Sequence, residues 1–173
     1  MPDSIDRHGA VDAATALGRV HLNEIAAVFN LIQDGSADGC FNDIYLQPRY
    51  QAGLGGQLLC VWGLGRIRLP DGRWSQAALR VVRRDGALAG FILTRDPAPG
   101  RREIYMCAVD SQWRRRGLGR LLVCAAQASL APGTTLEAHC RTPALAMRRL
   151  LQSAGFAPQK PGAGGVRGFV YRA

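Results

Sequence analysis

Between residues 102 and 127 the chain passes from an apolar strand pattern, through a short basic loop, into a Gly-x-Gly turn and a helical pattern. We expect the strand to end at Val109, and Gly117 and Gly119 to open the helix. The first backbone N–H groups of a helix have no partner inside it, and the helix dipole adds partial positive charge at that end. Glycine also lets a ligand approach the backbone closely. This order of residues predicts a binding site for a phosphate or pyrophosphate.

Positive side chains surround the predicted phosphate site. Guanidinium groups bind phosphate through paired, charge-assisted hydrogen bonds. Here they come from Arg114, Arg115, Arg116 and Arg120. The alternative is a glycine-rich turn that merely starts a helix. We prefer the binding site, because a strand precedes the loop and a helix follows it.

The motif Arg114-x-x-Gly117-x-Gly119, after a strand that ends in Cys107-Ala108-Val109, resembles the acetyl-CoA loop of the GNAT superfamily of N-acetyltransferases. In that family Arg or Gln is followed by two residues, Gly, one residue, and then Gly or Ala. The resemblance implies that acetyl-CoA is the acyl donor and an amine the acceptor. It implies cofactor contacts from the strand end and the loop, namely Cys107, Ala108, Val109, Arg114, Arg115, Arg116, Gly117, Leu118, Gly119 and Arg120.

The resemblance extends to both sides of the loop. Upstream, residues 103–109 are similar to the fourth strand of the histone-acetyltransferase branch, including its acidic residue. Downstream, Thr142-Pro143, a helical pattern and Gly155-Phe156 are similar to the family's last helix and its terminal Gly-Phe. The resemblance covers residues 76–173, whereas residues 1–75 match the family only loosely.

The resemblance implies an α/β fold of the GNAT type. Helices flank a central mixed, mostly antiparallel sheet, and splayed central strands hold acetyl-CoA. The hydrophobic periodicity agrees with this order, beginning with a helix from residue 22 that stops at Asp34-Gly35. The pattern then predicts strands at 75–84, 87–94, 103–109, 134–140 and 166–172, helices at 117–130 and 142–154, a turn at 96–100 and a loop at 158–165.

Residues 50–65 are harder to interpret. Leu54, Leu58 and Val61 have helical spacing. Glycines among them oppose a helix by roughly 1 kcal/mol each relative to alanine, so we expect a short, imperfect helix flanked by loop. A second phosphate loop at Gly53-Leu54-Gly55-Gly56 is the alternative, but no strand clearly precedes it.

The N-terminal part carries the weakest pattern. We find no convincing strand before the first helix. Residues 1–19 are polar and Ala-rich, and we expect an N-terminal segment with partial disorder. The resemblance implies one acetyltransferase domain over residues 20–173.

Glu103 and Tyr105 are the candidate catalytic residues. Acetyl transfer needs a neutral amine, and a carboxylate can take the amine's proton. By resemblance Glu103 matches an acidic position of the family, and the alternative is a strand-end charge paired with Arg101 or Arg102. Many family members protonate the departing thiolate with a tyrosine four residues before Gly-Phe, where this chain has Leu151. Tyr105, on the same strand face as Glu103, could replace that tyrosine, as could water.

The resemblance also assigns a role to strand backbone. It implies that the pantetheine arm pairs with Cys107 and Val109, and that an amide near Val109 stabilises the oxyanion. The cysteine side chain need not take part. His139 and Cys140 could form a nucleophile pair, but neighbouring strand residues point to opposite faces. We therefore prefer a buried Cys140 and a partly exposed His139.

Length, charge and cysteine content limit the classes of protein to which this chain can belong. The chain has 173 residues, a net charge of +9 and five cysteines without a Cys-x-x-Cys pair. We expect one domain, reduced thiols and no metal site. No apolar run is long enough for a bilayer and no secretory signal is present, so we expect a cytoplasmic protein without membrane contacts.

The positive charge favours anionic partners, with coenzyme A the first candidate. A second hypothesis is a catalytically silent acyl-CoA-binding sensor, motivated by the missing tyrosine. A third is nucleic-acid binding, which we do not favour because basic residues are not interleaved with aromatic stacking positions. Dimers are common in the family, so the resemblance allows a homodimer.

Overall fold

The computed structural model describes residues 15–173. One sheet has the strand order β1-β3-β4-β5-β6-β8-β7, and β2 pairs with β3 beside it. Neighbouring strands run antiparallel except β5 and β6, which are parallel. The strands are β1 (Thr15–Arg19), β2 (Arg66–Arg68), β3 (Trp74–Arg84), β4 (Ala87–Ala98), β5 (Arg101–Val109), β6 (Thr135–Cys140), β7 (Ala157–Pro161) and β8 (Arg167–Arg172).

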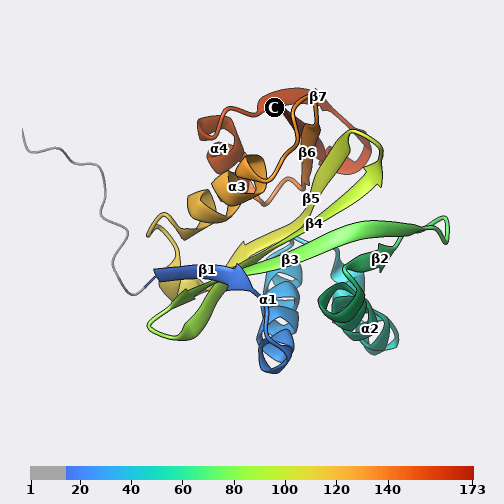
Figure 1. The fold of residues 1–173 in the computed structure, drawn as a ribbon, viewed down its shortest axis with the longest axis vertical. Helices are drawn as coiled ribbons and strands as arrows, with labels where there is room; N and C mark the ends of the chain where they lie inside the picture. Colours follow the sequence, from blue (N-terminus) through green and yellow to red (C-terminus); the bar gives the residue numbers. More distant parts are fainter. Residues whose placement is uncertain (1–14) are drawn as a thin grey trace, which may run out of the picture.

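Two helices pack on each face of the sheet (Figure 1). The faces are named here after them: the α1/α2 face and the α3/α4 face. Their bounds are α1 (Ile25–Ala37), α2 (Pro48–Leu64), α3 (Leu118–Ala128) and α4 (Leu145–Ser153), with short 3-10 turns η1 (Leu22–Glu24), η2 (Asp43–Leu46), η3 (Ser111–Trp113) and η4 (Ala163–Gly165). The predicted α/β architecture, a mixed and mostly antiparallel sheet flanked by helices, is confirmed.

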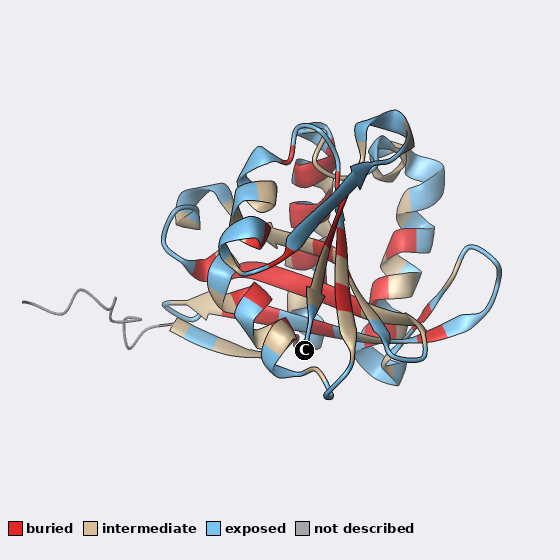
Figure 2. Ribbon diagram, turned by 90° about the horizontal axis from the view of Figure 1, so that it is seen from above, coloured by how far each residue is buried: buried red, intermediate tan, exposed pale blue. Residues whose placement is uncertain are grey.

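Alternating residues of β4 supply both layers of the core. Phe91 and Leu93 are buried under α1 and α2, whereas Ile92 is buried under α3 and α4. Leu122 of α3 and Leu151 of α4 are fully buried on the α3/α4 face. Each such side chain contributes about 1.5–3 kcal/mol of hydrophobic free energy. Figure 2 shows buried residues along the central strands and the inward helix sides, with exposed residues on the outer helix surfaces.

The chain has a first strand that the sequence did not predict. β1 pairs with β3 from Thr15 opposite Arg84 to Arg19 opposite Arg80. It is a five-residue edge strand without clear polar and apolar alternation, so its backbone pairing with β3 defines it. Of the predicted N-terminal segment, residues 1–14 lie outside the described residues.

Helix α2 is longer and more regular than the sequence predicted. It runs unbroken for 17 residues, and Leu54, Leu58 and Val61 form its buried side. A Cβ added at Gly53, Gly55, Gly56 or Gly63 would meet no atom within 4 Å, so these glycines lie on the open side of the helix. Apolar burial outweighs their low propensity. The second phosphate loop is thereby excluded, because Gly53-Leu54-Gly55-Gly56 is helix interior.

Several predicted boundaries were wrong because tertiary contacts extend the elements. Helix α1 continues past Asp34-Gly35 to Ala37. Gly35 does not stop the helix, and a glycine stands there because it packs against Phe41 at a distance that admits no Cβ. Strand β4 runs on through most of the predicted turn at 96–100. Strand β7 occupies part of the predicted loop at 158–165, where it pairs with β8.

The start of α4 also differs from prediction. Thr142 does not cap the helix, which begins at Leu145 after Ala144. The Thr142 hydroxyl instead donates to the carbonyl oxygen of Gly165 at 3.1 Å. The threonine therefore ties the turn before α4 to the segment before β8.

Candidate active site

The predicted phosphate loop has the geometry of an open helix start. Arg115 and Gly117 adopt left-handed backbone conformations with φ of 63° and 79°. The first bond within α3 is from the Leu121 N–H to the Gly117 carbonyl at 3.0 Å. The four amides from Gly117 to Arg120 therefore have no acceptor inside the helix. Because Gly117 is exposed and heads the helix dipole, this end can bind an anion.

The residues before Gly117 are held firmly by the rest of the site. The Asp110 carboxylate accepts a hydrogen bond from the Gln112 N–H at 3.0 Å, and this turn places Trp113. The Trp113 ring packs against the α3/α4 core with the Arg116 guanidinium 5.1 Å from its centroid. Arg114 Nε donates to the Val109 carbonyl at 3.2 Å. Trp113 thus anchors the loop.

Gly119 lies in a tightly packed position, whereas Gly117 is favoured by its backbone conformation. A Cβ at Gly119 would lie 3.1 Å from Leu150 Cδ2 and 3.8 Å from Val109 Cγ2. The start of α3 therefore fits closely against α4 and the end of β5. A Cβ at Gly117 would meet no atom within 4 Å, so only its φ resists substitution there.

Strands β5 and β6 pair only up to Ile104 and Ala138 and separate beyond them, and the space between them is called the cleft here. On its other edge β5 pairs with β4 up to Val109, opposite Gly90. With β6 it pairs only from Arg101 to Ile104, opposite Thr135 to Ala138. A register shift leaves Tyr105 as the extra residue of a β-bulge, which bends the strand at this point. Residues 105–109 therefore have no strand partner on this edge, where the Val109 carbonyl accepts a hydrogen bond from Arg114.

The thiols beside the cleft are poor nucleophiles. Burial, with a smaller effect of nearby Cys140, raises the pKa of Cys107 to about 12. Burial also raises the pKa of Cys140 to about 11. Since the thiolate is the reactive form, both residues are inert at neutral pH. Cys140 packs in the α3/α4 core and its neighbour His139 is exposed, as the strand alternation predicted.

Glu103 does not pair with Arg101 or Arg102, the partners considered as the alternative to a catalytic role. Arg95 Nε donates to Glu103 Oε2 at 2.7 Å, and both side chains are nearly buried. The other oxygen, Oε1, lies 3.4 Å from His139 Nδ1. Arg101 pairs instead with Glu137, and Arg102 pairs with Asp96.

Tyr105 extends the same polar network towards α2. Its hydroxyl oxygen lies 3.2 Å from that of Tyr45, and the Arg95 guanidinium lies 4.1 Å from its ring centroid. Burial, with further contributions from Tyr105, raises the pKa of Tyr45, so this phenol stays protonated. We call Tyr45, Arg95, Glu103, Tyr105 and His139 the Arg95 cluster. Leu151 lies in the core on the opposite face of the sheet.

Sequence reasoning identified two members of the Arg95 cluster as catalytic candidates and missed how they are connected. Arg95 stands opposite Glu103 in the register of β4 and β5. Tyr45 comes from η2, sixty positions away from Tyr105 along the chain. No local motif signals either contact, because both depend on sheet register and on the placement of the segment before α2.

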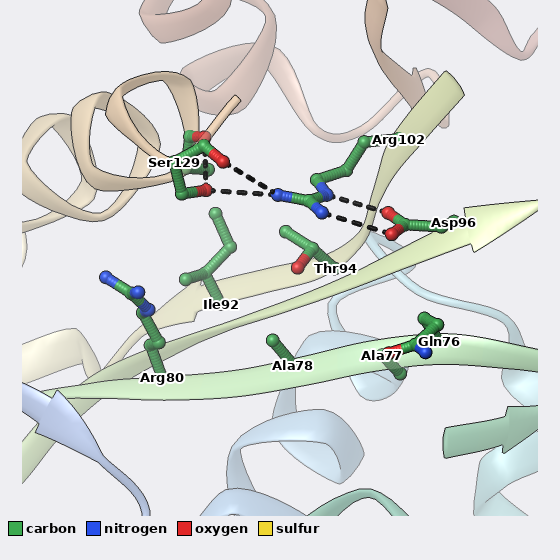
Figure 3. Close-up of a pocket in the computed structure, with 10 residues that line it drawn as sticks. Gln76, Ala77, Ala78, Arg80, Ile92, Thr94, Asp96, Arg102 and Ser129 are labelled. Carbon is green, nitrogen blue, oxygen red and sulfur yellow. Dashed lines mark hydrogen bonds and ion pairs between the residues drawn. The ribbon is translucent and has the colours of Figure 1, made fainter. Parts of the chain in front are cut away.

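A separate cavity of about 110 Å³ lies on the α3/α4 face (Figure 3). Arg102 crosses it, donating to Asp96 at 2.7 Å and to the Ser129 carbonyl at 3.2 Å. Ser129 follows the last residue of α3, about 16 Å along an eleven-residue helix from its first turn. This cavity is therefore distinct from the phosphate loop and from the Arg95 cluster.

Residues 15–173 contain neither a metal site nor a membrane-spanning helix. In that range no group of three or more His, Cys, Asp or Glu side chains is arranged to hold a metal ion. None of the helices described there is both long and apolar enough to cross a bilayer.

Comparison with known proteins places the chain in a family. The profile of the acetyltransferase (GNAT) family matches residues 60–156, more than half of the chain. No curated protein matches it.

Solved structures share its fold at low sequence identity. The PaiA N-acetyltransferase from Thermoplasma acidophilum, in complex with coenzyme A, has a TM-score of 0.69 and 9% identity over 92% of this chain and 99% of that one. YncA from Salmonella typhimurium, solved with acetyl-CoA, has a TM-score of 0.66 and 15% identity over 90% and 91%. The ribosomal-protein-S18-alanine N-acetyltransferase from Escherichia coli has a TM-score of 0.58 and 17% identity over 90% of both. On the family match, this chain belongs to the GNAT family of acetyltransferases.

Proposed function

We propose that this protein transfers an acyl group from acetyl-CoA to a primary amine by direct attack within a ternary complex. One observation carries the proposal: the open amides before Leu121 and the unpaired edge of β5 border the same cleft. An elongated ligand with a diphosphate at one end and a peptide-like arm matches both features. Similar structures were solved with coenzyme A or acetyl-CoA, which supports this choice of ligand.

The donor would lie along the cleft in a defined direction. Its diphosphate would accept hydrogen bonds from the amides of residues 117–120, with Arg114, Arg115, Arg116 and Arg120 adding charge. Its pantetheine arm would pair with β5 through Cys107 and Val109 on either side of Ala108. The thioester would then lie near the point where β5 separates from β6. An amide near Val109 would stabilise the oxyanion.

The acceptor amine would reach the thioester from the α1/α2 face, where the Arg95 cluster lies. The ammonium loses a proton, the amine nitrogen attacks the carbonyl carbon, and the C–S bond breaks as the C–N bond forms. We assign Glu103 to assist the first proton transfer and Tyr105 to protonate the departing thiolate. Two observations support the assignment of Tyr105: its ring belongs to the Arg95 cluster, and its strand borders the cleft.

Two assays test the proposal together. Calorimetry with acetyl-CoA measures binding, and thiol release measures turnover on free amino acids, spermidine, an aminoglycoside and peptides with free N-termini. We expect binding and turnover on at least one amine. A protein that does not bind acetyl-CoA would refute the proposal.

Two glycines with the same backbone conformation give a matched test of the loop. Gly117 and Gly133 both have φ of 79°, and a Cβ at either would meet no atom within 4 Å. Alanine should therefore cost both sites similar strain, about 1–2 kcal/mol of folding free energy. Gly117→Ala should weaken acetyl-CoA binding tenfold or more, about 1.4 kcal/mol, whereas Gly133→Ala should leave it unchanged. Equal affinities in calorimetry would place the phosphates elsewhere.

A second function is favoured by one observation. Leu151, at the position where many family members have tyrosine, is fully buried in the core. The protein could therefore bind acyl-CoA as a sensor without transferring the acyl group. Tight binding without thiol release on any amine would support the sensor over the transferase.

A further inference from the structure

His139 lies at the point where the cleft opens. The last paired position between β5 and β6 joins Ile104 to Ala138, and His139 is the next residue of β6. Ala138 and Cys140 pack in the α3/α4 core, so the imidazole between them faces the α1/α2 side. Its side chain is 49% exposed, whereas that of Glu103 is 13% exposed. Of these two groups the imidazole is the more accessible to an entering amine.

Both oxygens of Glu103 already have partners within the protein. Arg95 Nε donates to Oε2 at 2.7 Å, and His139 Nδ1 lies 3.4 Å from Oε1. A carboxylate held in this way is suited to orienting an imidazole, because it favours the form with a proton on Nδ1. Nε2 then keeps its lone pair and points away from Glu103. The 3.4 Å separation is long for a hydrogen bond, as is common for catalytic contacts before substrate binds.

We propose that His139 is the catalytic base of the transfer and that Glu103 acts as its positioning residue, an inference that rests on the proposed function. A proton passes from the substrate ammonium to His139 Nε2, and the freed nitrogen lone pair forms the bond to the thioester carbon. The C–S bond breaks with its electron pair remaining on sulfur. The second proton of the attacking nitrogen reaches the thiolate through water or Tyr105. The products are the amide, CoA thiol and a protonated imidazole, which returns its proton to solvent.

The charges around His139 suit this role. Glu103 faces it from β5, with Arg95 of β4 behind the carboxylate. Glu137 lies on the same face of β6 and pairs with Arg101 at 2.7 Å. On β8, Gly168 stands directly opposite His139 and contributes no side chain. The imidazole therefore faces Glu103 on one side and remains open to the acceptor on the other.

Replacing His139 gives the first test. With acetyl-CoA and the best amine from the panel, we expect His139→Ala to lower kcat by about 10²–10⁴-fold, with acetyl-CoA affinity unchanged. Added imidazole should restore part of kcat, because the exposed site can admit the free base. His21→Ala, at the exposed residue before η1, is the matched histidine control and should keep full activity.

Glu103→Gln tests the positioning role. The glutamine side chain keeps an oxygen that can accept a hydrogen bond from His139 Nδ1, but the negative charge is lost. We therefore expect kcat to fall less than in His139→Ala, and added imidazole should not restore the lost activity. A nitrogen-detected histidine spectrum of the wild-type protein provides a readout that needs no acceptor. We expect the neutral His139 ring to carry its proton on Nδ1.

The possible outcomes distinguish the proposed transferase function from the proposed role of His139 as the base. Wild-type protein that binds acetyl-CoA without turnover would refute the proposed function, and the role of His139 with it. Wild-type turnover with full activity in His139→Ala would refute only the role of His139. A neutral ring protonated on Nε2, or Glu103→Gln losing activity while His139→Ala retains it, would make Glu103 itself the base.

Discussion

Glu103 illustrates how one neighbour changes the chemistry of a side chain. In the sequence it is an acidic residue near the start of a strand, and it was predicted to be the general base. In the structure it is nearly buried and receives a hydrogen bond from Arg95 at 2.7 Å. Removing one partner of such a pair leaves the other charge uncompensated. Loss of activity in a Glu103 variant alone therefore does not identify the base, whereas the comparison with His139 does.

Leu151 gives a prediction at the same scale. Its side chain is fully buried among apolar residues, so a tyrosine there would overpack the core and bury a hydroxyl. We expect Leu151→Tyr to cost about 2–4 kcal/mol of folding free energy, to lower Tm by several degrees, and to leave kcat no higher. Thermal denaturation and thiol release measure the two effects.

Leu145→Tyr is the control for this substitution. Leu145 is in the same helix but 57% exposed, so its replacement should leave Tm nearly unchanged. A faster Leu151→Tyr enzyme of normal stability would mean that a hydroxyl at this position can reach the thiolate, against the placement of Leu151 in the core.

At the scale of elements, prediction worked where local pattern and tertiary contacts agree. β3, β5, β6, β8 and α3 were located within a few residues, because they combine apolar periodicity with turn or glycine boundaries. β1 and β7 were missed because they are short edge strands defined by backbone pairing with a neighbour. The loop motif could be read from sequence for a similar reason: its chemistry resides in consecutive backbone groups. The Arg95 cluster could not, because it joins four separate segments.

The glycines inside helix α2 lead to a prediction about stability. Gly53 and Gly56 lie inside the helix on its open side, so alanine would add helix propensity without a clash. We expect each substitution to stabilise the fold by about 0.5–1 kcal/mol and the double variant to raise Tm by a few degrees. Differential scanning calorimetry measures the change.

Gly35 in α1 is the matched control. A Cβ there would lie 2.6 Å from the Phe41 ring, so Gly35→Ala should lower Tm. If the α2 double variant were also less stable, Gly53 and Gly56 would not lie on an open side of the helix. If it gained stability and lost only turnover, the open side of α2 would belong to the acceptor site.

For the whole molecule, the distribution of charge matters more than its sum. The net charge is +9, but many carboxylates of the described chain are paired with arginine, including Glu24, Asp96, Glu103 and Glu137. The arginines of the phosphate loop are exposed around the start of α3, and of the described carboxylates only that of Asp38, itself exposed, pairs with Arg114. The excess charge is thus placed where a small polyanion would bind, which favours coenzyme A over an extended nucleic-acid track.

Salt dependence tests this distribution directly. Raising KCl from about 0.05 M to about 0.5 M should weaken acetyl-CoA binding several-fold, because the exposed loop charges are screened. Arg116→Gln should weaken binding at low salt and flatten the salt dependence, whereas Arg68→Gln, at an exposed position of β2, should do neither. Calorimetry measures these affinities.

Competition with nucleic acid tests the same charge distribution, using a labelled DNA duplex and single-stranded RNA as competitors of acetyl-CoA. Since the described surface offers a compact anion site, neither nucleic acid should displace acetyl-CoA at moderate salt. Displacement by either at concentrations near that of the cofactor would show that the basic surface serves a nucleic-acid partner.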